Sequence, residues 1–181
     1  MLSITIGDAD FYDEKTDKFI TVKGKTLQLE HSLVSVAKWE SKWKKPFLSV
    51  KDKTREETID YIKCMTITQN VNPLLYTLIS NNQINQISEY INDPMTATTF
   101  KKQEGKGVSR RVLTSEDIYY YMTALQIPFD PCQKWHFNRL LTLIRVCNDE
   151  QQPKKKMKKA DIASQRRGLN AARRARFHTR G

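Results

Sequence analysis

The positive charge of this chain is concentrated at its C-terminal end. Of 181 residues, 31 are lysine or arginine and 20 are aspartate or glutamate, for a net charge of +11. Residues 151–181 hold eleven of the bases and one acid, Asp161, a balance of +10. The remaining twenty bases and nineteen acids leave residues 1–150 at +1. Because a block of like charge is typical of an interaction arm rather than a packed domain, we predict a body over 1–150 and a basic C-terminal arm over 151–181.

Residue patterns in the body predict a mixed α+β domain. Alternating residues indicate short N-terminal strands at 2–6 and on both sides of Gly24, with a turn at 14–18. Helical spacing and capping signals then predict helices over 32–43, 54–65, 73–79, 81–91, 114–127 and 130–147. The stretches 96–100 and 108–113 resemble two strands, which predicts a β-hairpin inserted between helices.

Several helix ends are marked by individual residues. Ser32 and Thr114 are candidate N-caps, and Thr54 with Glu57 three residues later forms a capping box. Asp130 followed by Pro131 is typical of a cap with proline in the first helical position. We therefore expect one helix to begin at Asp130.

The sequence contains no recognisable catalytic or metal-binding motif. A nucleophile would need a base and an orienting acid nearby, and no motif supplies them. On the expected helix, Cys132 and His136 are four residues apart and would face one side, whereas Cys147 would be about three turns beyond His136. Two ligands do not complete a zinc site. We expect a buried thiol and a hydrogen-bonded imidazole, and predict a protein that is not an enzyme and has no metal or cofactor.

Aromatic residues give two candidate contact sites in the body. Trp39 and Trp43 are four apart on one helix and have lysines around them. This arrangement fits a surface that stacks bases and holds phosphates. The near-neutral charge of the rest of the body instead favours indoles in the core or lining a groove, with the lysines on the solvent side. In the run 119–121 the three tyrosines point in different directions, which leaves one or two, such as Tyr120, for contact with a partner.

The arm combines arginines with a narrow apolar stripe. From residue 160 its composition favours a helix, with Ile162, Leu169 and Ala172 at helical spacing and Gly168 in the middle. A short basic helix is marginal alone in water, so we expect it to become helical when bound to RNA, DNA or an acidic protein groove. The predicted contacts are Ile162, Leu169, Arg166, Arg167, Arg173, Arg174 and Arg176.

Three stretches resemble proteins from the structural gene clusters of tailed bacteriophages, of the kind labelled tail assembly chaperones. They are LEHSLVSVAKWESKWKKPFLS (29–49), IYYYMTALQIPFDPCQKWHFNRLLTLI (118–144) and QRRGLNAARRARFHTRG (165–181). The resemblance implies a small, largely helical, non-enzymatic protein that keeps the tape measure protein soluble and helps recruit tail-tube subunits. The strand-rich start and the basic end also fit a virion component, such as a connector or tail-completion protein, and the arm fits a nucleic-acid-binding protein.

Other features suit a protein of the infected bacterial cytoplasm or of the virion. The three cysteines form no CxxC pair and are odd in number, which fits a reducing compartment. No apolar run reaches the eighteen residues typical of a membrane span, and the first residues lack the pattern of a signal peptide. We expect a phage structural protein as partner, non-specific nucleic-acid binding through the arm, no membrane contact, and an oligomer as one possible state.

Overall fold

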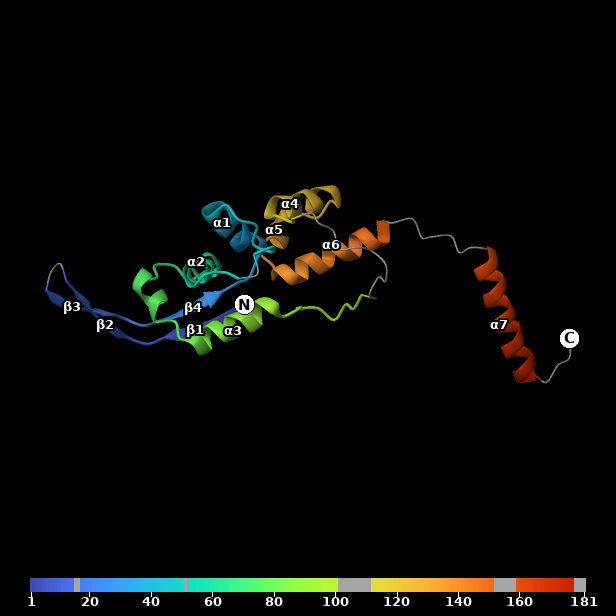
Figure 1. The fold of residues 1–181 in the computed structure, drawn as a ribbon, viewed down its shortest axis with the longest axis horizontal. Coiled ribbons are helices and arrows are strands. Elements are labelled where there is room, and N and C mark those ends of the chain that lie inside the picture. Colours follow the sequence, from blue (N-terminus) through green and yellow to red (C-terminus); the bar gives the residue numbers. More distant parts are fainter. Residues whose placement is uncertain (15–16, 51, 101–111, 152–158, 178–181) are drawn as a thin grey trace. The chain divides into compact units, whose positions relative to one another are not determined.

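Four short antiparallel strands begin the chain. This computed structural model describes residues 1–14, 17–50, 52–100, 112–151 and 159–177. β1 (Leu2–Ile6) pairs with β4 (Lys25–Leu29), and β2 (Ala9–Asp13) pairs with β3 (Lys18–Val22). The chain therefore runs outward through β1 and β2 and returns through β3 and β4 (Figure 1). The strands expected at 2–6 and on both sides of Gly24 are confirmed.

Gly24 is required where the two strand pairs meet. A Cβ atom at this position would lie 2.3 Å from the Ile6 carbonyl oxygen, and the Gly24 amide donates a 2.6 Å hydrogen bond to the Asp8 carboxylate. Only a residue without a side chain allows the two backbone segments to approach this closely. The glycine thus fixes the junction between the pair that packs on the body and the outer hairpin.

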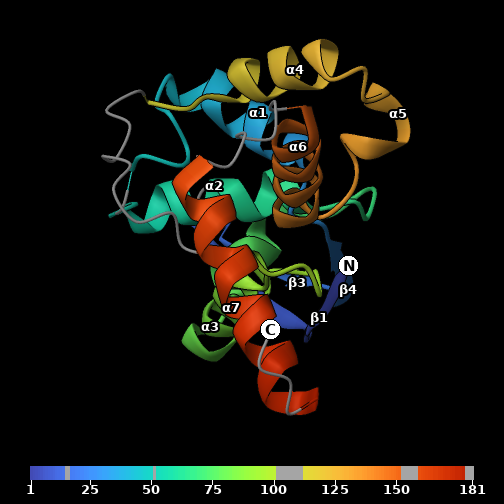
Figure 2. The same ribbon diagram turned by 90° about the vertical axis from the view of Figure 1, so that its right-hand side faces the viewer.

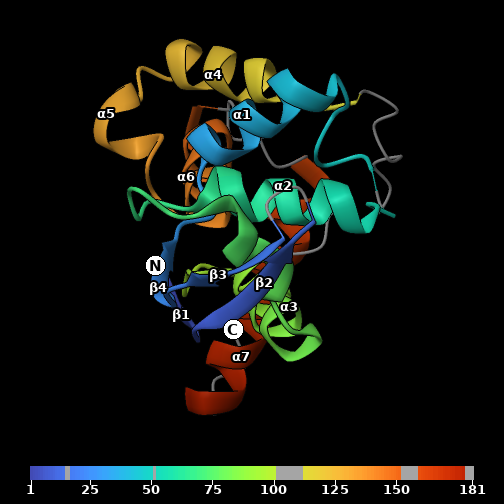
Figure 3. The same ribbon diagram turned by 90° about the vertical axis from the view of Figure 1, so that its left-hand side faces the viewer.

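Two capped helices follow the strands. α1 (Leu33–Trp43) begins after Ser32, and α2 (Arg55–Met65) begins after Thr54, whose hydroxyl and Glu57 form the predicted capping box. Later come the 3-10 helix η1 (Pro73–Leu78), α3 (Asn81–Asn92) and α4 (Ser115–Ala124). α1 lies between α2 and α4, and α3 packs against β1 (Figures 2 and 3).

The single helix expected from Asp130 is wrong at its beginning. The segment instead forms a short α5 (Phe129–Cys132), a turn, and then α6 (Phe137–Gln151). Asp130 has ψ 131°, the extended conformation that a residue before proline prefers. The N-terminus of α6 is fixed by a residue far away in the sequence, because the Phe137 amide donates a 2.7 Å hydrogen bond to the His31 carbonyl oxygen.

The expected inserted hairpin is not supported by the part of it that is described. Residues 96–100 form no strand, and the Thr98 amide instead donates to the Thr96 hydroxyl in a local turn. Among the described residues, the paired strands all lie at the N-terminal end, and an isolated antiparallel bridge joins Leu29 of β4 to Thr66. Residues 101–111, which include the expected tip, lie outside the described residues.

One hydrophobic core joins the strands to the helices of the body. Its fully buried side chains come from β4, α1, α2, η1, α4 and α6, and they include Leu27, Leu29, Leu33, Trp39, Ile62, Met65, Leu75, Ile118, Met122, Phe137 and Leu140. The contacts divide the chain into two compact units, Met1–Asn148 and Asp149–Gly181. The second unit contains α7 (Lys159–Phe177). In the described ranges, no helix has both the length and the apolar character needed to cross a bilayer.

Candidate partner-binding surfaces

Trp39 belongs to the core and is closed to any partner. Its exposed fraction is 0%, and its indole N–H donates to the Glu57 carbonyl oxygen at 2.9 Å. Its ring lies edge-on to Phe47, with centroids 5.3 Å apart, and is stacked with Trp43 at 6.3 Å. Of the two interpretations that the sequence left open for this residue, the structure supports the core.

Trp43 is the half-exposed member of the pair. The ammonium groups of Lys42 and Lys45 lie 5.7 and 5.8 Å from the centre of its ring, within range of cation–π attraction. Its indole nitrogen has no hydrogen-bond partner among the described atoms. A lysine also lies near the other indole, since the Lys53 ammonium is 5.7 Å from the centre of the Trp39 ring. Because Trp39 is fully buried, the aromatic and lysine combination is accessible only at Trp43 of this pair.

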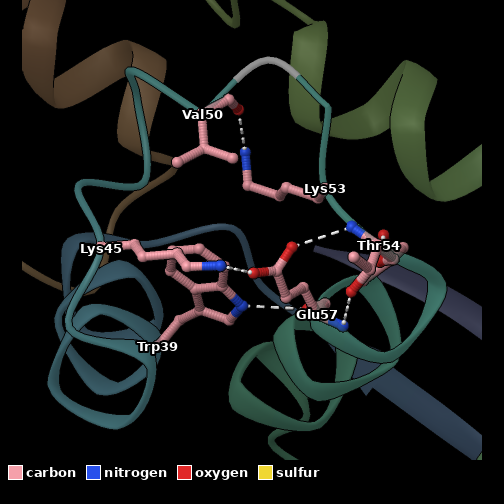
Figure 4. A network of polar contacts seen from close by, with 7 residues as sticks. Trp39, Lys45, Val50, Lys53, Thr54 and Glu57 are labelled. Carbon is pink, nitrogen blue, oxygen red and sulfur yellow. Dashed lines mark hydrogen bonds and ion pairs between the residues drawn. The ribbon is translucent and has the colours of Figure 1, made fainter.

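Glu57 clamps α1, α2 and the loop between them (Figure 4). One carboxylate oxygen accepts from the Lys45 ammonium at 2.6 Å, and the other accepts from the Thr54 amide at 2.8 Å. The bond from Lys45 is the main cause that lowers the pKa of Glu57, and the Thr54 amide adds to it. Its backbone carbonyl also holds Trp39. Lys45 thus stabilises the fold, and the clamp fixes the loop before α2.

Tyr120 is the exposed tyrosine of its run. α4 turns Ile118 and Met122 into the core, which leaves Tyr120 with 66% of its surface exposed. Tyr119 is partly buried, and its hydroxyl donates to the Gln133 side chain at 3.2 Å. Tyr120 is accessible to a partner, as the sequence predicted, and it lies on a different helix from Trp43.

α7 presents arginine and apolar side chains together. Because a helix repeats every 3.6 residues, Ile162 and Leu169 share one side with Arg166 and Arg173. Phe177, four residues after Arg173, extends the same side, and we call these five residues the mixed face. Leu169 is 56% exposed and Phe177 is 65% exposed. The sequence reasoning missed Phe177, although its spacing from Arg173 could have identified it.

The other predicted arm residues lie around this mixed face. Arg176 and Ala172 border it on one flank, while Arg167 and Arg174 lie on the other flank, and all four are exposed. The Arg167 guanidinium donates to the Ala163 carbonyl oxygen at 3.4 Å. No carboxylate in the described chain forms an ion pair with an arginine of α7. The cations of α7 are therefore open to an anionic partner.

A cavity of about 520 Å³, which we call the α3 cavity, opens in the body. Apolar side chains of α3 form one wall, the loop before α2 forms another, and α6 contributes Asn138. No pattern in the sequence indicated the α3 cavity, because its lining residues lie far apart along the chain, from His31 to Asn138.

His31 lines this cavity and is neutral. Its Nδ1 shares a hydrogen bond with the Tyr61 hydroxyl, and its ring lies edge-on to His136. Burial is the main cause that lowers the pKa of His31 to about 3, and the charges of His136 and Lys53 lower it further. Burial also raises the pKa of Tyr61. The pair is an uncharged part of the core at neutral pH.

Cys132 and His136 do not share a helix face, because a turn separates α5 from α6. The thiol is buried, and Nε2 of His136 is hydrogen-bonded to the Tyr90 carbonyl oxygen at 3.0 Å. Within the described part of the chain, no three histidine, cysteine or acidic side chains lie close enough to hold a metal ion.

Comparisons of the chain with protein-family models, with curated proteins and with solved structures find no match. The functional interpretation therefore rests on the surfaces described above.

Proposed function

We propose that the protein is a non-enzymatic assembly factor of tailed bacteriophages, a tail assembly chaperone that binds the tape measure protein and helps recruit tail-tube subunits. It would act in the cytoplasm of the infected host. The observation that carries the proposal is the mixed face of α7, where exposed Leu169 and Phe177 lie among arginines. The phage context comes from the sequence resemblance at 29–49, 118–144 and 165–181.

The composition of this face favours a protein as partner. Burying an exposed apolar side chain against a partner stabilises the complex by about 25 cal/mol per Å² of apolar surface removed from water. A phosphate backbone offers arginine its charge but offers Leu169 and Phe177 little apolar surface. An amphipathic segment with acidic flanks would satisfy both kinds of side chain on α7. A long helical protein that must be kept soluble during assembly has this character.

A second candidate function is nucleic-acid binding, either by a free protein or by a virion component such as a connector or tail-completion protein. The balance of +10 over residues 151–181 favours it. Arginines on three sides of α7 would neutralise phosphates whatever the sequence of the nucleic acid. The two candidates differ in whether the apolar residues of the mixed face contribute to affinity.

Co-expression with the tape measure protein encoded in the same phage genome tests the proposal. The full chain should keep the tape measure protein soluble and co-purify with it. The variant Leu169→Asp should lose most of this effect, because it places a carboxylate on the mixed face. Ala171→Asp, which places the same charge on the opposite side of α7, is the matched control and should retain it. Equal behaviour of the two variants, or no soluble complex with the full chain, would contradict the proposal.

A further inference from the structure

The α3 cavity combines an apolar wall with one half-buried cation. Ile84, Ile87 and Ile91 follow one another at helical spacing along α3, and Phe47 and Leu48 face them from the loop. Leu48 lines the cavity with 42% of its surface exposed. At about 520 Å³ the cavity is within the usual range of ligand-sized sites, about 300–1,000 Å³. It has room for a few side chains of a partner.

Lys53 supplies the cation. Its ammonium group donates to the carbonyl oxygens of Phe47 at 3.0 Å and of Val50 at 2.9 Å, and the bond to Val50 is drawn in Figure 4. It lies 4.1 Å from the centre of the Phe47 ring. These two hydrogen bonds occupy two of the three N–H donors of the Lys53 ammonium group. In the residues that the structure describes, no carboxylate lies within ion-pair distance of this nitrogen.

The surroundings of Lys53 favour an incoming anion. Burial lowers the pKa of its ammonium group, which means that the charge is held at a cost in free energy. A carboxylate brought into the cavity would offset that cost, since an ion pair is strengthened where water is excluded. The two backbone carbonyls hold the ammonium in place beforehand, which reduces the entropy lost on binding.

We propose that the α3 cavity binds an apolar segment of a protein partner, and that one carboxylate within that segment pairs with Lys53. This inference rests on the proposed function, because it describes the chemistry of the same partner. The mixed face of α7 independently favours an apolar and acidic segment. Two sites of matching preference on one chain raise the total affinity for a long partner that presents such segments repeatedly.

A pair of synthetic peptides tests the proposal on the full-length protein. The probe is a fluorescein-labelled amphipathic helix of about 18 residues, five turns, with a leucine stripe and one glutamate within it. The matched peptide has glutamine in place of the glutamate. Fluorescence anisotropy should show that the wild-type protein binds the glutamate peptide about tenfold more tightly, a difference of the size expected for one charged hydrogen bond.

Variants of the protein assign this preference to Lys53. Lys53→Met should bind both peptides equally, Lys53→Arg should keep the preference, and Lys23→Met, which removes an exposed lysine outside the cavity, should behave as the wild type. Ile84→Glu should weaken both peptides at least tenfold. Urea unfolding of each variant checks that it is folded, and Lys53→Gln, which also removes the cation, takes the place of Lys53→Met if that variant is not folded.

Equal binding of the two peptides to the wild type, or an unchanged preference in Lys53→Met, would overturn the inference. Binding of sodium decanoate in the cavity without binding of either peptide would also overturn it, since the site would then take a small carboxylate. The two tests can fail separately: the peptide test compares variants of Lys53 in the cavity, whereas the co-expression test compares Leu169→Asp with Ala171→Asp in α7.

Discussion

The body and α7 use charged side chains in opposite ways. In the body, Lys45 and Glu57 hold each other and cap a helix, and the charges of residues 1–150 nearly cancel. In α7 the arginines are exposed and none of the described ion pairs involves them. The body uses its polar groups to fix one fold, whereas α7 leaves its arginines, Leu169 and Phe177 exposed. A helix of this kind gains most of its stability from what it packs against.

Replacing Trp39 by alanine should have the largest effect on the stability of the body. Trp39 is fully buried and bonded to Glu57, so Trp39→Ala should cost about 3–5 kcal/mol in the free energy of unfolding. Trp43→Ala is the matched control, and since that ring is only half-buried its cost should be clearly smaller. Urea unfolding followed by circular dichroism measures both. Similar values for the two variants would contradict the division between a core indole and a half-exposed one.

Acid should weaken the body through His31. Its pKa falls from 6.5 in the unfolded chain to about 3 in the folded protein. The unfolded chain therefore binds a proton that the folded body refuses, and stability present above pH 6.5 is lost as the pH falls towards 3. Between pH 7 and 4.5 the loss should be about 2.5–3 kcal/mol, at about 1.4 kcal/mol per pH unit.

The variant His31→Gln isolates this contribution from those of the acidic residues. Its free energy of unfolding, measured in urea at the same pH values, should fall less steeply than that of the wild type. Parallel curves for the two proteins would show that His31 is protonated as easily in the folded body as in the unfolded chain.

A small change in α7 should leave the body untouched. Gly168→Ala meets no atom within 4 Å of the new Cβ and should favour the helix by about 1 kcal/mol. The expected result is more helical signal in circular dichroism at low urea, tighter partner binding, and no change in the unfolding midpoint of the body. A shift of that midpoint would show that α7 and the body do not unfold independently.

Local signals in the sequence were sufficient for most of the fold. Ser32, Thr54 and Thr114 cap their helices as predicted, because a cap depends on residues within one turn. α6 begins at Phe137 because the Phe137 amide is hydrogen-bonded to the carbonyl oxygen of His31, far away in the sequence. No local sequence pattern predicts such a long-range hydrogen bond. The expected strand at 96–100 is not formed, and the Thr98 amide bonds to the Thr96 hydroxyl instead.

The candidate sites divide in the same way. The mixed face of α7 follows from helical spacing, so all of it except Phe177 was predicted from the sequence. Trp39 and Trp43 were recognised as a pair, but only packing against Phe47 and Glu57 decides which one is buried. The α3 cavity and the role of Lys53 depend on elements that are brought together by the tertiary fold, so periodicity gave no indication of them.

The salt dependence of binding tests most directly whether α7 is a docking helix for protein. Affinities of the full chain for the tape measure protein and for a DNA duplex of about 20 base pairs are measured over a range of salt concentrations. An arm that neutralises about six phosphates gives a slope of log affinity against log salt near −5. We predict a shallower slope with the protein partner and an affinity reduced at least tenfold by Leu169→Asp but not by Ala171→Asp. Tighter binding to DNA with a slope near −5, unaffected by Leu169→Asp, would contradict this account.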